Sequence, residues 1–469
     1  MRQSLIRTAL DVVAYAQRPA IQIRGESTAV RQMVGGLLMT FLLAAAPAFS
    51  LTDEEVFRDF RFNMINPGAR SLALAGAFIS LADDATAAQA NPAGLSYLLK
   101  REYFIELRGV DNGGRVADLR DSLPTGVQIN VLTGSALDDA RNITFASAVF
   151  PIKRLTLGLS RQVVLNNSAS TLNSFSFLFS GGNPGSSTIQ ASGALDVSQT
   201  NLNASGGFRV NDKLSFGVSV AYSRLEVNSD VESFIFDPSG NIAGSPILQP
   251  TLDVRTRIDD GDSALGLTIG TLMRPAEAFS VGAVYRKAPK FAVIEQVVPG
   301  GLDIFGVQAT LGSRFENTFN VPDSYGVGAS WRPTRFLTVA MDVERIEYSD
   351  LVDGYVPGVN TLTGFDAEFT SDDATDYRLG GEYVLLLKNG IILAPRVGAF
   401  TRSDNTVRAT RTGTGTDVYA TTGSFPGRDR EIHGAIGLGV GVGRQQIDLG
   451  ANLGSSVNEF LVSYIFRGK

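Results

Sequence analysis

The sequence of 469 residues contains no cysteine and a single histidine, His433. A chain without cysteine can form neither a disulfide scaffold nor a metal site built from thiolates. With one histidine and no Ser–His pair to recognise, we expect that the protein is not an enzyme and that it binds no cofactor. The basic residues are not gathered into a patch, which argues against nucleic acid as a partner.

The sequence also lacks an apolar run of the roughly 20 residues that a transmembrane helix needs. Its most apolar segment, residues 34–46, reads VGGLLMTFLLAAA and is followed by the small-residue pattern Ala46-Pro47-Ala48, with arginines upstream. This arrangement predicts a secretory signal peptide over residues 1–48 with a long basic region, or a true start at Met33. The exported chain is then either soluble outside the cytoplasm or a membrane β-barrel.

After residue 101, apolar residues alternate with small or polar ones, which is the period of a strand with one apolar face. Phe216, Val218 and Val220, for example, alternate with Gly217 and Ser219. Charged residues in these segments fall on the polar face, and we place that face in a lumen because a charge facing lipid costs several kcal/mol. We predict strands at 102–110, 141–150, 154–164, 198–210, 214–227, 262–273, 278–291, 319–332, 335–349, 375–387, 391–402, 430–442, 445–453 and 458–466.

These segments are joined alternately by short and long connectors, as in barrels of the bacterial outer membrane. Short connectors such as 211–213 carry turn residues, and long ones such as 165–196 are rich in glycine, serine, threonine and asparagine. We therefore predict an all-β fold, a transmembrane antiparallel β-barrel of about 14 strands over residues 101–469. Two apolar pieces inside predicted loops, 126–132 and 175–179, leave sixteen strands open as an alternative.

Residues 49–100 differ from the rest, and we predict an N-terminal arm followed by a small helical hatch, or plug, inside the lumen. The plug, residues 68–98, is rich in alanine and ends in Asn91-Pro92-Ala93-Gly94-Leu95. Because proline ends a helix, Asn91-Pro92 either caps a plug helix or marks a hinge at which the plug moves. In the arm, Phe57, Phe60 and Phe62 either form an amphipathic surface or insert into a lumenal pocket as ligand-binding residues.

Three other features favour plain structural roles. Asp83 and Asp84 have no catalytic partner, so we expect them to be solvated or to cap the backbone. The glycine-rich run Gly434–Gly443 lacks the Lys-Ser/Thr of a phosphate loop, and its alternation predicts a strand. His433, near the start of a late strand, is expected to be structural, and no spacing of histidine and aspartate supports a metal site.

Two parts of the sequence match a known pattern. They are Ala75-Gly76-Ala77-Phe78 with Ala82–Ala87 and Asn91–Leu95 in the plug, and Val321–Gly328 continuing through 332–339 to Tyr348-Ser349-Asp350. Together they resemble the FadL/OmpP1 family, outer-membrane transporters of long-chain fatty acids and other hydrophobic compounds. The resemblance implies a fourteen-stranded barrel with an N-terminal hatch, located in the cell outer membrane.

The resemblance also implies a passive mechanism, in which extracellular loops capture a ligand, a pocket in the barrel binds it, and the hatch rearranges to release it, laterally in the family. Asn91, Pro92 and Ala93 are the implied gating residues. Burial of an acyl chain yields about 0.8 kcal/mol per CH₂, so an apolar pocket can hold one without charge chemistry. For a lumenal cation that would bind a carboxylate, our candidate is Arg396.

The implied partners are outer-membrane lipids and a hydrophobic ligand, such as a long-chain fatty acid or an aromatic hydrocarbon. The barrel assembly machinery is a further implied partner during biogenesis, because the last strand ends in the aromatic Phe466. Two other functions share these features. One is a PorV-like barrel that acts as a shuttle or attachment partner in protein secretion, and the other is a structural outer-membrane barrel.

Overall fold

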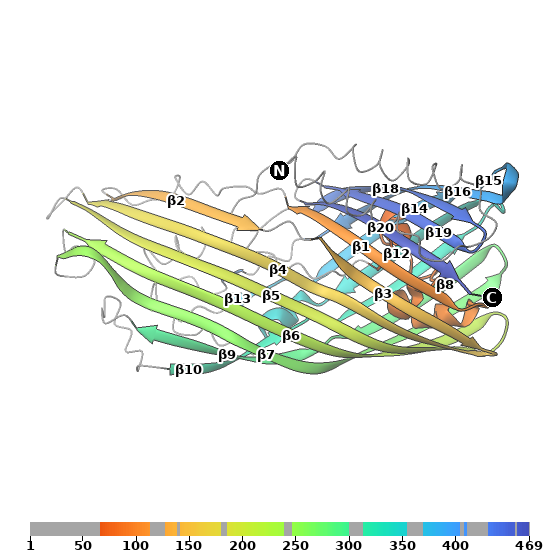
Figure 1. Ribbon diagram of the computed structural model, residues 1–469, viewed down its shortest axis with the longest axis horizontal. Coiled ribbons are helices and arrows are strands. Elements are labelled where there is room, and N and C mark those ends of the chain that lie inside the picture. The colour runs from red at the N-terminus through yellow and green to blue at the C-terminus, as the bar shows by residue number, and fades with distance from the viewer. Residues whose placement is uncertain are drawn as a thin grey trace, which may run out of the picture. The chain divides into compact units, whose positions relative to one another are not determined.

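The structure is a computed structural model of the chain, shown as a ribbon in Figure 1. The predicted signal peptide, 1–48, and the arm with Phe57, Phe60 and Phe62 lie outside the described residues. The structure describes residues 66–112, 127–137, 141–179, 185–238, 246–299, 313–353, 369–403, 408–409, 430–454 and 457–468.

A ring of 14 antiparallel strands forms the barrel. The ring closes because β1 pairs with β20, from Glu102 opposite Arg467 to Asn112 opposite Val457, and closure leaves no free sheet edge. This confirms the predicted fold. The strands of the ring are β1 (Glu102–Asn112), β3 (Arg141–Ile152), β4 (Leu155–Phe179), β5 (Gly185–Arg209), β6 (Leu214–Asp237), β7 (Ile247–Ala276), β8 (Phe279–Lys287), β11 (Ser324–Trp331), β12 (Leu337–Ile346), β14 (Ala374–Tyr383), β16 (Ile391–Arg402), β18 (Glu431–Val442), β19 (Gln445–Leu453) and β20 (Val457–Arg467).

Further strands lengthen the wall at the end opposite the short turns. β2 (Val127–Leu137) pairs with residues 169–179 of β4, beyond the stretch that pairs with β3. The two apolar pieces at 126–132 and 175–179 thus pair with each other instead of adding two strands to the ring, and the alternative of sixteen strands is wrong. The remaining elements are β9 (Lys290–Pro299), β10 (Ser313–Asn320), β13 (Phe369–Thr370), β15 (Leu385–Leu386), β17 (Arg408–Ala409), η2 (Tyr348–Val352) and η3 (Lys388–Gly390).

The prediction of a long loop at 165–196 is wrong, since most of this segment is strand. β4 and β5 pair from Leu155 opposite Phe208 to Phe179 opposite Gly185, with one irregularity between Val163 and Leu165. Outside the apolar band, water can reach both faces of a strand, so both faces can be polar and no hydrophobic alternation marks it. Serine, threonine and asparagine in this segment therefore gave it the composition of a loop.

The two faces of the wall differ as the alternation predicts. On β6, Phe216, Val218 and Val220 are 42–49% exposed on the outside, while Ser215 and Ser219 are buried in the lumen at 0% and 2%. Apolar side chains outside and small polar ones inside are the arrangement of a barrel that spans a membrane.

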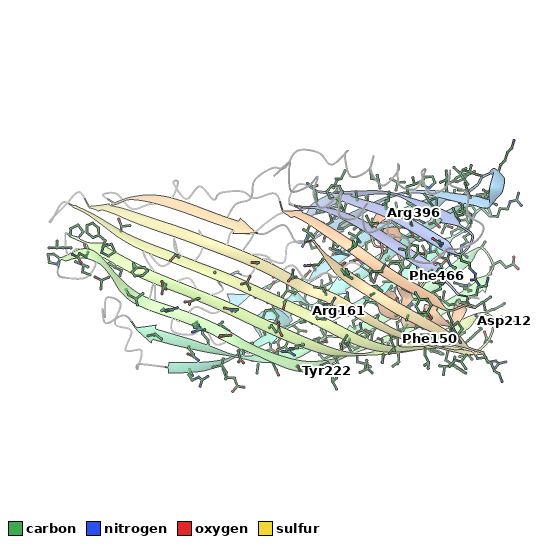
Figure 2. All side chains as sticks on the ribbon, viewed as in Figure 1. Phe150, Arg161, Asp212, Tyr222, Arg396 and Phe466 are labelled. Atoms are coloured by element: carbon green, nitrogen blue, oxygen red, sulfur yellow. The ribbon has the colours of Figure 1, made fainter. Side chains whose placement is uncertain are left out.

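Exposed aromatic residues mark two levels of the outer face. Pairs of them stand six positions apart on one strand, or about 20 Å along it. They are Phe279 and Tyr285 on β8, Tyr325 and Trp331 on β11, and Tyr377 and Tyr383 on β14. Figure 2 shows Phe150 and Phe466 near the end with the turn at Asp212, and Tyr222 farther along the wall. Aromatic girdles at both interfaces border the apolar band of outer-membrane barrels, and these two levels fit that pattern.

The plug lies inside the ring, close to the end that carries β15 (Figure 1). It contains only short helices, α4 (Ala69–Ala73), α5 (Ala87–Ala90) and η1 (Pro92–Tyr97), joined by turns. Within the part of the chain that the structure describes, no helix is both long and apolar enough to cross a membrane. The predicted helical plug is confirmed as a compact set of turns and short helices.

Candidate functional site

Nine glycines form a belt on the inner face of the wall, where the plug lies against it. Gly207, Gly217 and Gly270 lie directly opposite one another on β5, β6 and β7, and Gly282 and Gly328 do so on β8 and β11. A Cβ at any member would come within 3.1 Å of a plug atom, so only glycine admits the plug at this distance. The glycine belt consists of Gly207, Gly217, Gly270, Gly282, Gly328, Gly380, Gly398, Gly437 and Gly450.

The predicted gating residues Asn91, Pro92 and Ala93 are buried between the plug and this belt. The Asn91 side-chain nitrogen donates to the carbonyl oxygens of Ile79 in the plug and Thr271 in the wall, each at 3.0 Å. Its side-chain oxygen accepts from the backbone nitrogen of Ala93 at 3.2 Å, so Asn91 is the N-cap of η1, with Pro92 at the first position. The segment therefore both caps a helix and bonds the plug to the barrel.

A network of buried charges fixes the other side of the plug. The guanidinium of Arg70, in α4, lies 2.5 Å from Asp83 of the plug and 2.9 Å from Glu382 of β14. Asp84 caps the backbone as predicted, accepting from the nitrogen of Thr86 at 2.9 Å. Asp83, by contrast, is held in an ion pair with Arg70 and is not simply solvated.

Arg396 belongs to the same network. Only 5% of this residue is exposed, and its guanidinium lies 2.7 Å from Glu382 and 2.6 Å from Asp448. The residue is on the lumenal face, as predicted, and is labelled in Figure 2. Two carboxylates already neutralise its charge, and one of them, Glu382, also binds Arg70 of the plug.

Two more wall residues hold the plug, and the sequence had not identified either as a candidate site residue. Asp342 accepts hydrogen bonds from the consecutive backbone nitrogens of Phe78 at 2.7 Å and Ile79 at 2.8 Å. Arg286 donates to the carbonyl oxygen of Ala90 at 2.8 Å and pairs with Glu344 at 2.6 Å. Both lie on the lumenal phase of predicted strands. Alternation places Asp342 in the lumen and could have placed Arg286 there, but it could not name their partners.

Directly beside the plug is a lumenal pocket of about 80 Å³ that is rich in carboxamides. We call it the amide pocket. Alternate residues of β5 enter it, because successive side chains of a strand point to opposite faces. Its six carboxamide residues are Asn66, which directly precedes the plug, Gln89 of the plug, and Gln162, Gln199, Asn201 and Asn203 of the wall.

A group of buried apolar side chains adjoins the amide pocket on the side away from the plug. Along the lumenal face of β5, Ser205 bonds to the plug, Asn203, Asn201 and Gln199 line the pocket, and Val197 follows in the apolar group. Val164 and Val321 belong to both. The apolar cluster consists of Val164, Leu165, Val197, Leu225, Val227, Phe291, Val293 and Val321. The lumen thus changes from apolar to amide-lined to plugged toward the short-turn end.

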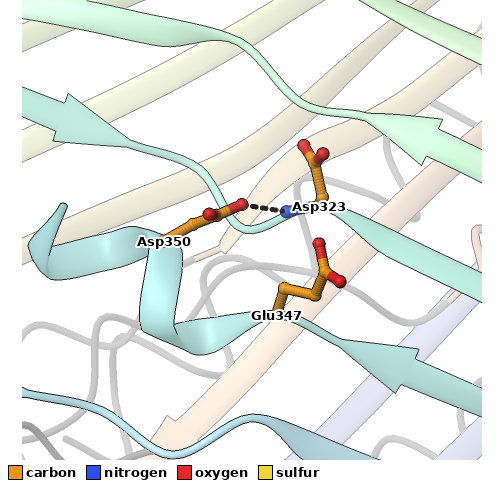
Figure 3. Close-up of side chains that lie close together, drawn as sticks. All are labelled: Asp323, Glu347 and Asp350. Atoms are coloured by element: carbon orange, nitrogen blue, oxygen red, sulfur yellow. Dashed lines mark hydrogen bonds between the residues drawn. The ribbon is translucent and has the colours of Figure 1, made fainter.

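One group of carboxylates among the described residues has the spacing of a metal site. Asp323, Glu347 and Asp350 offer oxygens within 4.8 Å of one another. Figure 3 shows the three side chains gathered at one place. Lys287 lies 2.6 Å from Asp323 and supplies the positive charge there. We therefore assign no metal to this acidic cluster.

His433 has the structural setting that the sequence predicts. It is fully buried and stacks on Phe400 with ring centroids 4.8 Å apart. Its ring nitrogen Nε2 lies 3.2 Å from Glu431. The glycine-rich run Gly434–Gly443 lies in β18 and at the turn after it, which confirms the predicted strand.

A closed strand ring with an apolar outer band, a polar lumen and an internal plug defines an outer-membrane β-barrel of the plugged-channel class. The family described as outer membrane protein transport protein (OMPP1/FadL/TodX) matches residues 60–388. The chain therefore belongs to this family of outer-membrane transport proteins. Among curated protein sequences, none matches the chain.

Solved structures share the fold. A Pseudomonas aeruginosa FadL homologue aligns with a TM-score of 0.56 at 14% identity, over 86% of this chain and 99% of its own. The Ralstonia pickettii toluene transporter TbuX gives 0.52 at 14% identity, over 87% and 100%. The P. putida toluene transporter TodX gives 0.52 at 16% identity, over 87% and 99%. At identities this low, the structural similarity shows a common fold and nothing more specific.

Proposed function

We propose that the protein carries hydrophobic compounds passively across the outer membrane. The ligand enters from the extracellular end, binds in the lumen beside the plug, and leaves after the plug rearranges. The observation that carries the proposal is the layering of the lumen, with the apolar cluster followed by the amide pocket and then by the plug at the glycine belt. A long-chain fatty acid and an aromatic hydrocarbon are the two ligand classes to be compared, since two of the similar solved structures are named as toluene transporters.

Rearrangement of the plug is part of the proposal because the glycine belt brings plug atoms against nine wall positions. A hydrophobic molecule in the amide pocket must therefore either displace part of the plug or leave through the wall. Asn91, Pro92 and Ala93 are the proposed gating residues. We further propose that residues 1–48 export the chain and that the barrel assembly machinery inserts it.

A disulfide between plug and wall tests directly whether the plug must rearrange for transport. Because the chain has no native cysteine, no other thiol competes for the crosslink. A Cβ built at Gly158 of β4 lies 3.6 Å from the Cβ of Ala88 in α5, within the usual range for a disulfide. The variant Ala88→Cys/Gly158→Cys should take up labelled fatty acid or toluene slowly when oxidised and at the wild-type rate when reduced. The host strain should lack its own transporters of this family.

A matched disulfide within the wall is the control. The same Cβ at Gly158 lies 3.7 Å from the Cβ of Ser205, its partner on β5, so Gly158→Cys/Ser205→Cys crosslinks two strands and forms no covalent link between plug and wall. It also removes the hydrogen bond from Ser205 to Ala88, under oxidising and reducing conditions alike. Uptake should then be the same under oxidising and reducing conditions. Normal uptake by the oxidised plug–wall variant would refute plug movement. Failure of the wild type to take up either ligand class would refute transport and favour a PorV-like secretion partner or a structural barrel.

A further inference from the structure

Two carboxamide oxygens in the amide pocket have no hydrogen-bond donor. They are the side-chain oxygens of Gln162 and Gln199, in residues that are 3% and 0% exposed. No donor among the described residues reaches either atom. An unpaired acceptor in a buried site is unfavourable, so this part of the pocket is complementary to a molecule that brings donors.

The neighbouring carboxamide groups do not supply hydrogen-bond donors to these two oxygens. The side-chain nitrogen of Gln199 donates to Asn201 at 3.3 Å, and that of Asn203 donates to Ser160 at 3.2 Å. Gln162 of β4 lies directly opposite Asn201 of β5, the strand that also carries Gln199. The two unpaired oxygens therefore belong to adjacent strands of one wall. They form a site built into the sheet.

The charges that line the pocket are already paired. Arg286 lies 2.6 Å from Glu344 and also donates to Asn66 at 3.1 Å, while Lys287 lies 2.6 Å from Asp323. A carboxylate has no donor to offer the glutamine oxygens and would place its own negative oxygens beside them. The pocket therefore disfavours an anionic head group.

We propose that the amide pocket selects hydrophobic molecules carrying an uncharged hydrogen-bond donor, with a hydroxyl group as the type case. The hydroxyl donates to Gln162 or Gln199, and the hydrocarbon part contacts the adjoining apolar cluster. This specificity rests on the proposed transport function and names its ligand class as neutral alcohols, in preference to alkanes or carboxylates. A plain hydrocarbon leaves both oxygens unpaired. A ligand that cannot form the hydrogen bond binds more weakly, because the buried polar groups of the site then stay unpaired.

The test compares 1-octanol, n-octane and octanoate, which share a chain of the same length and differ at its end. Initial uptake of each radiolabelled compound is measured in cells lacking their own transporters of this family, with uptake in empty-vector cells subtracted. The wild type should favour octanol over octane by about ten-fold, the effect of one well-placed hydrogen bond. The variant Gln162→Leu/Gln199→Leu keeps similar side-chain size and should reduce this preference to about two-fold or less.

A matched substitution outside the pocket controls for loss of a buried amide. Asn452, on β19, is 2% exposed and also has an unpaired side-chain oxygen, but it does not line the pocket. Asn452→Leu should retain the wild-type octanol preference. Heat-modifiable mobility in electrophoresis shows for each variant that the barrel is folded.

The outcomes separate the two proposals. Equal wild-type uptake of octanol and octane, or an octanol preference that survives in the double glutamine variant, overturns the specificity and leaves transport standing. Faster uptake of octanoate than of octanol overturns it as well. If the wild type carries none of the three compounds and neither fatty acid nor toluene, transport itself fails.

Discussion

The guanidinium of Arg70 and the carboxylate of Glu382 meet in a two-point ion pair. Nε donates to Oε2 at 2.9 Å and the second terminal nitrogen donates to Oε1 at 3.0 Å. Arg70 lies in the plug, and Glu382 lies 312 residues later in the barrel wall. Such planar pairs fix orientation as well as distance, so this contact sets the position of α4 against the wall.

The substitution Glu382→Gln should weaken the attachment of the plug. It keeps the shape of the side chain but removes the negative charge that Arg70 and Arg396 share. We expect the free energy of unfolding to fall by about 3 kcal/mol, as when one partner of a buried pair is removed. Urea unfolding in lipid vesicles, followed by the fluorescence of the single tryptophan Trp331, measures it.

Glu226→Gln is the matched control for that experiment. Glu226 pairs with Arg224 at 2.9 Å, but 66% of the arginine side chain and 60% of the glutamate side chain are exposed. Exposed pairs contribute between about 0 and 1 kcal/mol, so its unfolding free energy should stay within that range of the wild type. Equal losses in the two variants would show that Glu382 does not anchor the plug.

Replacing Asn91 and Pro92 by alanine should impair uptake while the barrel still folds. The asparagine loses its bonds to Ile79 and Thr271, each worth about 1 kcal/mol, and initial uptake should fall by about ten-fold. Uptake of the ligand carried by the wild type measures the effect, and heat-modifiable mobility checks folding.

The control for this pair is Asn211→Ala, in a short exposed turn. The Asn211 side chain accepts from the backbone nitrogens of Lys213 and Leu214 within its own turn, and it is not bonded to Ile79 or Thr271. Its loss should leave uptake unchanged. Normal uptake in the Asn91 and Pro92 variant would remove the gating role from these residues.

A side chain added to the glycine belt should displace the plug. In Gly217→Val, the new Cβ would lie 2.1 Å from the carbonyl carbon of Pro92 and 2.2 Å from the nitrogen of Ala93, so the plug backbone must move. We expect larger single-channel conductance in planar bilayers and a loss of about 1–3 kcal/mol in unfolding free energy. Gly434→Val, where nothing lies within 4 Å of the added atom, should leave both unchanged. Wild-type conductance in Gly217→Val would mean that the belt does not seat the plug.

Calcium should not stabilise the acidic cluster of Asp323, Glu347 and Asp350. The ammonium group of Lys287 already lies 2.6 Å from Asp323, and a divalent cation would have to displace it. The midpoint of urea unfolding is therefore expected to be the same with excess calcium and with a chelator. A midpoint that rises with calcium and falls with chelator would reveal a metal site.

Much of the barrel follows from local sequence. The side-chain period of two identifies a strand and its apolar face without reference to any other segment, so Phe216 and Ser215 alone assign the outside and inside of β6. The fourteen strands of the ring and the lumenal position of Arg396 were predictable for this reason. The extended ends of β4 and β5 were not, because a strand with water on both faces carries no such period.

The contacts that make the candidate site were decided by the tertiary structure. Sequence alone determined that Asn91-Pro92 interrupts the plug and that glycines occur on lumenal positions of the wall. Only the closed ring brings Asn91 to Thr271, gives Arg396 its two carboxylates, and leaves Gln162 and Gln199 unpaired beside the apolar cluster. Periodicity acts over a few residues, whereas these contacts join residues far apart in the chain, whose distances depend on strand register and ring closure.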